Sequence, residues 1–127
     1  MDQYMTVPYV EGGRTLDGWD CWGCVYVVGK EVYGRNYPSY DDTYEVPFDY
    51  DELCNLIVTQ SRSRWTQKGV PTPGDVIVFN IKGRPVHVGL FIGQSMFIHA
   101  LDGSNTTIEK YTSALWRKRV EGFYDYG

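Results

Sequence analysis

The pattern of hydrophobic and polar positions changes about halfway along the chain. Residues 21–34, CWGCVYVVGKEVYG, carry apolar side chains around most of a helical circumference. They end at Gly34, a residue type that commonly follows the last turn of a helix. Asp20 precedes them and is among the residues preferred as an N-cap. This segment therefore predicts a buried helix that begins at or next to Cys21.

A polar stretch and a second helical pattern follow. Residues 36–48 are rich in Tyr, Pro and Asp, which is typical of an irregular surface segment. Residues 49–64 predict a second helix, started by Asp49 or Asp51. Its apolar face contains Leu53, Leu56 and Ile57.

The second half of the chain has a shorter period. Five runs rich in β-branched or aromatic residues are separated by Gly, Pro, Asn and Asp; they are residues 76–81, 86–92, 96–101, 106–111 and 117–124. Helices followed by consecutive strands are typical of an α+β fold. We therefore expect one domain over residues 1–127, with N-terminal helices packed on an antiparallel β-sheet of about five to six strands.

Composition and charge exclude several classes of partner. The chain has 127 residues and 43% apolar content, enough for a core without disulfide or metal support. The net charge of -4 is scattered, and the basic cluster at residues 116–119 is too short for a nucleic-acid interface. No window approaches the roughly 18 apolar residues of a membrane span. We expect neither nucleic-acid binding nor membrane insertion, and a soluble protein without a secretion signal of its own.

The three cysteines indicate thiols rather than a disulfide framework. Cys21 and Cys24 have the Cys-x-x-Cys spacing of redox pairs and of half a zinc site. A second pair of closely spaced ligands is missing, and the strand and helix order differs from that of thioredoxin-like proteins. We therefore expect no metal and no cofactor.

The expected position of Cys21, at the start of a helix, affects the reactivity of its thiol. Helix N-terminal N–H groups and the helix dipole favour a thiolate there, whereas Asp20 opposes it, so a cationic partner is needed. The chain has only two histidines, His87 and His99. They lie twelve residues apart, on either side of a turn at residues 93–95, which can place both on one face of a hairpin. This spacing alone also fits two ordinary strand histidines.

Short motifs in a fixed order run through nearly the whole chain. They are Pro8-Tyr9, Gly12-Gly13, Gly18, Asp20-Cys21, Gly23, Pro73-Gly74-Asp75-Val76, His87-Val88-Gly89, Ile92-Gly93 and Phe97-Ile98-His99-Ala100. In this order and spacing the set resembles the NlpC family of papain-like cysteine peptidases, which are cell-wall hydrolases. The resemblance implies the papain-like NlpC fold and a thiol protease that degrades the cell wall.

The resemblance also assigns roles to individual residues. Cys21 corresponds to the nucleophile, His87 to the general base and His99 to the residue that orients the base. We expect the Cys21 sulfur within about 4 Å of a ring nitrogen of His87, with His99 near the other nitrogen. Tyr9 corresponds to a tyrosine that faces the nucleophile and helps to bind the oxyanion.

The residues around the nucleophile also depart from the family pattern. Asp20 and Trp22 flank Cys21 and join Tyr9 as candidate oxyanion or substrate-binding residues. Trp22 and Cys24 replace a serine and a large apolar residue of the family pattern. We expect Cys24 to be a small buried hydrophobic residue, and Cys54 to be a core or surface packing residue of the second helix.

The implied reaction is hydrolysis of a stem peptide of bacterial peptidoglycan, most often between γ-D-glutamate and a diamino acid. Residues 36–40 and 115–124 resemble a subgroup encoded with bacteriophage tail genes. This implies phage tail proteins as partners and a location in the virion tail, or in the host cytoplasm during assembly. We expect residues 33–50 and 123–126 to offer exposed aromatic surfaces for docking.

Three alternatives to this function stay open. They are a tail-assembly protein with little hydrolytic role, a secreted antibacterial effector, and an acyltransferase or amidase using the same Cys–His pair.

Overall fold

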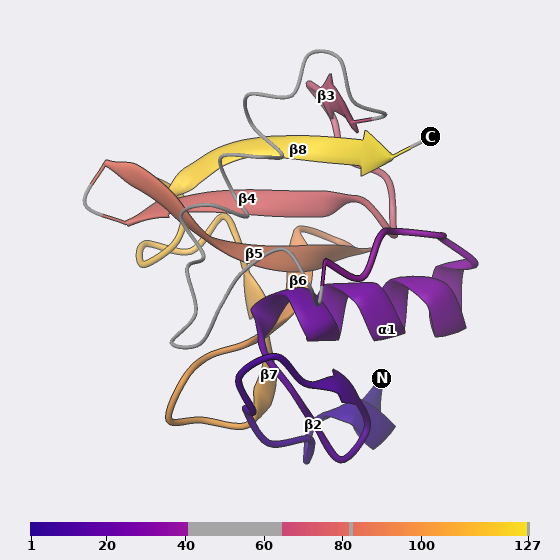
Figure 1. Ribbon diagram of the computed structural model, residues 1–127. Helices are drawn as coiled ribbons and strands as arrows, with labels where there is room; N and C mark the ends of the chain where they lie inside the picture. The colour runs from indigo at the N-terminus through magenta and orange to yellow at the C-terminus, as the bar shows by residue number, and fades with distance from the viewer. Residues whose placement is uncertain (41–64, 82, 127) are drawn as a thin grey trace.

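The computed structural model describes residues 1–40, 65–81 and 83–126 and contains one α-helix packed on a six-stranded sheet (Figure 1). The elements are η1 (Asp2–Tyr4), β1 (Arg14–Thr15), β2 (Gly18–Trp19), α1 (Cys21–Tyr33), β3 (Trp65–Lys68), β4 (Val76–Ile81), β5 (Arg84–Gly93), β6 (Met96–Ala100), β7 (Thr106–Lys110) and β8 (Val120–Tyr126). This is the α+β class expected from the sequence.

Both ends of α1 follow from its flanking residues. Asp20 has an extended backbone, and its side chain accepts a hydrogen bond from the Gly23 N–H at 2.7 Å. Such an N-cap is worth about 1 kcal/mol. At the other end Gly34 has φ of 64°, a left-handed conformation that glycine adopts without strain. The predicted helix and both of its caps are confirmed.

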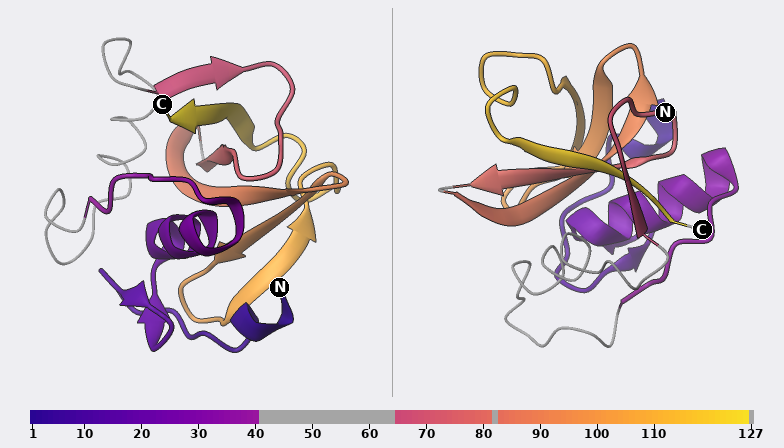
Figure 2. Two further views of the ribbon diagram at one scale, coloured as in Figure 1. Left: turned by 90° about the vertical axis from the view of Figure 1, so that its right-hand side faces the viewer. Right: turned by 90° about the horizontal axis from the view of Figure 1, so that it is seen from above.

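The large sheet has the strand order β3-β8-β4-β5-β6-β7, and all neighbouring strands are antiparallel. Each of the five predicted strands is present, with β4 over the predicted residues 76–81. The edge strand β3 was missed because WTQK offers only one apolar residue, Trp65. Figure 2 shows the sheet curving around α1, which lies against one face of it.

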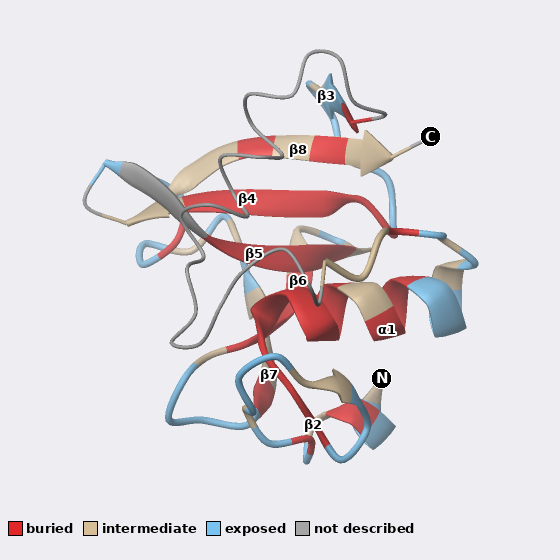
Figure 3. Cartoon of the chain, in the orientation of Figure 1, coloured by how far each residue is buried: buried red, intermediate tan, exposed pale blue. Residues whose placement is uncertain are grey.

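The centre of the sheet is buried (Figure 3), and buried clusters lie on both of its faces. Along β4, Val76 and Val78 face one cluster while Ile77 and Phe79 face another. The α1-face cluster comprises the buried residues Tyr4, Val7, Trp19, Cys21, Trp22, Cys24, Val25, Val27, Val28, Tyr37, Trp65, Val76, Val78, Val88, Leu90, Ile98, Ala100 and Tyr124. The back-face cluster comprises Ile77, Phe79, Phe91, Phe97 and Trp116. Burial on both sides explains why β4 begins with an unbroken apolar run instead of an alternation.

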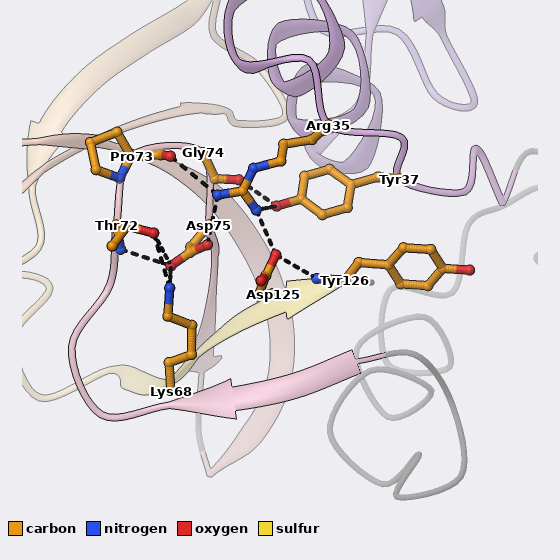
Figure 4. Close-up of polar contacts among 9 residues, drawn as sticks. All are labelled: Arg35, Tyr37, Lys68, Thr72, Pro73, Gly74, Asp75, Asp125 and Tyr126. Atoms are coloured by element: carbon orange, nitrogen blue, oxygen red, sulfur yellow. Dashed lines mark hydrogen bonds and ion pairs between the residues drawn. The ribbon is translucent and has the colours of Figure 1, made fainter.

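A buried carboxylate ties the end of α1 to the sheet (Figure 4). Asp75 accepts hydrogen bonds from Lys68 Nζ at 2.7 Å and from Arg35 Nη2 at 3.1 Å. Arg35 also pairs with Asp125 of β8 at 2.6 Å. Burial acts to raise the pKa of Asp75, but the hydrogen bonds from Lys68 and Thr72 outweigh it and hold the pKa below its ordinary value. This network fixes the start of β4 relative to α1 and β8.

The described aromatic residues proposed for docking are buried or pack against the core. Tyr37 and Tyr124 are each 3% exposed, and Tyr40 and Tyr126 pack against the α1-face cluster. Phe123 packs against the back-face cluster. These rings help to cover the sheet, and docking through the half-buried ones stays a prediction.

Two sequence predictions lie outside the described residues. They are the second helix at residues 49–64, with Cys54, and most of the irregular segment at residues 36–48. Within the described ranges, no helix is long and apolar enough to cross a membrane.

Candidate active site

The two histidines meet on neighbouring strands. His87 lies on β5 and His99 on β6, and the pairing of Leu90 with Ile98 and of Phe91 with Phe97 places both imidazoles on one face. His87 Nε2 and His99 Nδ1 are 2.8 Å apart, within hydrogen-bonding distance. The expectation that one imidazole contacts the other across the hairpin is confirmed.

Aromatic rings enclose this pair. The Trp116 indole stacks on His87 with ring centroids 5.9 Å apart, and Phe97 lies 4.5 Å from His99. His87 is 5% exposed and His99 is fully buried. Burial, with a smaller contribution from His99, lowers the pKa of His87 to about 3. Burial lowers the pKa of His99 to about 4, so both imidazoles are neutral at neutral pH.

A third residue, Glu109, extends the pair and was missed by the sequence analysis. Its Oε2 lies 2.7 Å from His99 Nε2. Glu109 is on β7, where Phe97 pairs with Glu109 and His99 with Thr107, so Glu109 and His99 share a face as diagonal neighbours. Only the register between β6 and β7 identifies this contact, and the sequence does not specify that register.

Cys21 is the first residue of α1 and has no exposed surface. It belongs to the α1-face cluster together with Ile98 and Ala100 of β6. His99 lies between these two residues and therefore points to the opposite face of the sheet. The expected 4 Å contact between Cys21 and His87 stays a prediction. The catalytic roles of these residues stay predictions.

Asp20 and Trp22 are held in structural contacts. Asp20 is fully buried and accepts hydrogen bonds from the Gly12 and Gly23 N–H groups and from Arg14. Trp22 is also fully buried, and its indole donates to the carbonyl of Pro38 at 2.8 Å. These contacts explain why both side chains are fixed beside Cys21. Their contact with a substrate stays a prediction.

Tyr9 lies beside the strand that leads into α1. It forms a bridge with Trp19, two residues before Cys21. With Pro8 it lines an open hollow whose other wall is formed by Gly103, Ser104 and Asn105. The structure therefore brings Tyr9 to a surface hollow, where a ligand could reach it.

Cys24 lies one helical turn after Cys21 and is also fully buried. Burial raises the pKa of its thiol, and Asp20 adds to this effect. Cys24 is therefore an inert packing thiol, as the sequence analysis expected. Within residues 1–40, 65–81 and 83–126, no three His, Cys, Asp or Glu side chains converge as metal ligands would.

Comparison with known proteins places most of the chain in one family. The family model described as NlpC/P60 matches residues 6–124. The Escherichia coli K12 protein named murein DD-endopeptidase MepS/murein LD-carboxypeptidase is 32% identical over 122 residues, covering 94% of this chain and 57% of that protein. The Bacillus subtilis gamma-DL-glutamyl hydrolase is 27% identical over 129 residues, covering 95% of this chain and 26% of that protein.

The chain thus spans little more than half the length of the first of these relatives, and about a quarter of the second. Among solved structures, the NlpC/p60 domain of the peptidoglycan hydrolase SagA has a TM-score of 0.62 at 21% identity. That match covers 98% of this chain and 91% of the solved one. An NlpC/P60 family protein from Bacillus cereus has a TM-score of 0.67 at 21% identity, covering 97% of this chain and 36% of the other.

Proposed function

Because this chain belongs to the NlpC/P60 family, we propose that it is a cysteine peptidase domain that hydrolyses the peptide part of bacterial peptidoglycan. The observation that carries the proposal is the family match over residues 6–124, which includes a cysteine at the first position of α1 and two paired histidines on the sheet. The name of the E. coli relative, a murein DD-endopeptidase, supports the substrate class.

The reaction is acyl transfer to the cysteine followed by hydrolysis. The Cys21 thiolate attacks the peptide carbonyl, and His87 holds the proton taken from the thiol. The C–N bond breaks as His87 gives this proton to the leaving amine, which leaves a thioester on Cys21. A water molecule, deprotonated by His87, then releases the acid and restores the thiol. The backbone N–H of Cys21 and the Tyr9 hydroxyl stabilise the oxyanion, and one such donor is typically worth about 10²–10³ in rate.

The proposed reaction requires the base and the nucleophile to come into contact. General-base catalysis requires His87 within about 3.2 Å of the Cys21 sulfur, or a single water between them. The buried neutral imidazoles and the Cys21 thiol lie on opposite faces of the sheet. We propose that the free domain also populates a state in which these groups meet, and that peptidoglycan binding favours that state.

The same separation favours a second candidate function. A domain whose nucleophile and base stay apart would bind the wall peptide, or assemble with other proteins, without turnover. This second candidate predicts binding to sacculi that Cys21→Ala leaves unchanged and no release of fragments. The peptidase proposal predicts fragment release that Cys21→Ala abolishes.

For the scissile bond we propose γ-D-glutamyl–diamino acid. The name of the B. subtilis relative, a gamma-DL-glutamyl hydrolase, supports cleavage next to glutamate. The test is to incubate the protein with purified sacculi and to identify the released fragments by mass. Fragments that end at D-glutamate support the proposal, and fragments cut between other stem residues overturn it. Cys24→Ala serves as the matched control for Cys21→Ala, because both thiols are fully buried on the same helix.

We propose a bacteriophage tail as the place of action, with tail proteins as partners. The support is the sequence resemblance at residues 36–40 and 115–124 to a tail-encoded subgroup. Mass spectrometry of purified virions tests it: abundant protein in tails supports the proposal, while detection only outside any phage overturns it. The latter result would favour the antibacterial effector alternative.

A further inference from the structure

We propose that Glu109 is a positioning residue that fixes the proton positions of the His99 and His87 imidazoles, so that His87 presents a bare Nδ1 as the base. This inference rests on the proposed peptidase function. It follows from two contacts in series: Glu109 Oε2 to His99 Nε2 at 2.7 Å, and His99 Nδ1 to His87 Nε2 at 2.8 Å.

The three residues form a polar line from the surface into the sheet. Glu109 has a side chain that is 32% exposed, whereas the His99 side chain is fully buried. His87 is next, under Trp116. Because β5, β6 and β7 are consecutive neighbours in the sheet, the line crosses three paired strands. Paired strands hold side chains more rigidly than loops do, which suits a positioning role.

The chemistry of the donor and acceptor atoms sets the tautomers. A carboxylate can only accept, so the hydrogen at the Glu109 contact belongs to His99 Nε2. A neutral imidazole protonated at Nε2 has a bare Nδ1, which can only accept. His99 Nδ1 therefore accepts from His87 Nε2, which leaves Nδ1 of His87 without a proton. Neutrality of both rings agrees with their lowered pKa values.

This order of protons gives Glu109 a role in the reaction. When His87 takes the thiol proton at Nδ1, its ring becomes a cation in an apolar environment, which is unfavourable without compensation. The positive charge is stabilised by His99, which accepts from His87 Nε2 and donates to the Glu109 carboxylate. No proton moves to Glu109, as in catalytic triads whose carboxylate orients and stabilises an imidazolium.

The other elements packed against the pair bring little charge to it. β4 contributes Phe79, whose ring is 5.9 Å from His87, and the segment after β7 contributes Trp116. Arg119 lies over the Trp116 ring, 5.6 Å from its centroid. Within the described residues, the charged side chain that bonds to the histidine pair is therefore Glu109.

The test determines directly which ring nitrogens of the two histidines carry a proton. The chain has only two histidines, so ¹⁵N labelling of histidine gives four ring signals that NMR can assign to protonated and bare nitrogens. At pH 7 we expect both rings to be protonated at Nε2. In Glu109→Leu the His99 proton is no longer fixed, and the signals of both rings should shift toward mixed tautomers. Glu109→Asp retains the carboxylate and should retain the Nε2 tautomers.

Glu121→Gln is the matched control, because Glu121 is a strand carboxylate that accepts from the Tyr124 hydroxyl instead of a histidine. It should leave all four signals unchanged. A wild-type protein with Nδ1 protonated on either ring, or a folded Glu109→Leu variant with unchanged signals, would overturn the proposal. Circular dichroism verifies that each variant is folded.

Activity provides a separate readout. We expect Glu109→Leu to lower kcat/KM on peptidoglycan by about 10- to 100-fold, less than the roughly 10⁴-fold loss when the acid next to a catalytic base is neutralised. The limb of the pH profile that reports the imidazole should move to lower pH, because a stabilising negative charge is lost. A rate loss with an unchanged pH profile would indicate a merely structural role. An inactive wild-type protein with the expected NMR signals would reject the proposed function and leave the proton positions established.

Discussion

Both faces of the sheet bury aromatic residues, but the two faces differ in how their buried polar groups are hydrogen-bonded. On the α1 face, the three tryptophans each donate to a partner: Trp19 to Thr106, Trp22 to Pro38 and Trp65 to Tyr40. On the back face, the Trp116 indole N–H is buried without a hydrogen-bond partner among the described residues. The same face buries two neutral histidines.

This difference separates stability from function. Satisfied polar groups in a close-packed cluster favour one rigid structure, whereas a buried titratable pair costs stability and is retained where chemistry needs it. In the proposed mechanism, the α1 face holds the nucleophile Cys21 in place, and the back face holds the groups that move protons. The following changes test this division.

The largest effect is expected from removing the base. His87→Ala should lower kcat/KM on peptidoglycan by about 10⁴-fold or more, since removing one member of a catalytic set removes most of its contribution. Cys24→Ala, on the α1 face, should retain activity and lose only about 1 kcal/mol of stability. Turbidity loss of sacculi suspensions measures the activity of both variants. An active His87→Ala variant would show that the back face has no part in catalysis.

Acid should lower the free energy of unfolding through the two histidines of the back face. The histidines have an ordinary pKa of about 6.5 when unfolded but about 3 and 4 in the folded protein, so the unfolded chain binds protons first as the pH falls. Stability should thus fall between pH 6.5 and about 4, by roughly 2–3 kcal/mol per histidine. Above pH 6.5 these two groups contribute no pH dependence.

Urea unfolding at several pH values measures this slope. His99→Leu should flatten it, and an unchanged slope would contradict the neutral buried pair. Asp75 provides an internal comparison, because its folded pKa lies below its ordinary value of 3.8. Its contribution is lost only as the pH falls through that lower range.

A smaller effect should distinguish the two indoles. Trp22→Phe leaves the carbonyl of the half-buried Pro38 without its donor and should cost about 0.5–1.5 kcal/mol more than the loss of ring volume alone. Trp116→Phe removes a donor that has no partner among the described residues, so only the volume loss applies. Thermal unfolding of both variants measures the difference. Equal destabilisation would mean that the indole N–H groups of Trp22 and Trp116 do not differ in their hydrogen bonding.

The sequence predicted the elements better than their arrangement. α1 was identifiable because Asp20 and Gly34 mark its ends, and β4 to β8 because apolar runs alternate with turn residues. β3 was not identifiable, since its pairing with β8 depends on a distant partner and not on local pattern.

The contacts of the candidate site could also be predicted only in part. The separation of His87 and His99 across a short turn allowed their contact, because hairpin geometry relates spacing to face, but the family resemblance was needed to predict it. Glu109 and Trp116 could not be predicted, since both reach the histidines through tertiary contacts. The face occupied by Cys21 depends on how α1 docks, which a family motif does not specify.

The most direct test of a Cys21–His87 pair is site-specific alkylation. Cys21 and Cys24 are both fully buried, so accessibility alone predicts similar rates. Mass spectrometry after iodoacetamide treatment at pH 6 should show Cys21 labelled, Cys24 and Cys54 largely untouched, and Cys21 labelling lost in His87→Ala. Equal labelling of Cys21 and Cys24, or Cys21 labelling that persists without His87, would contradict the proposed catalytic pair.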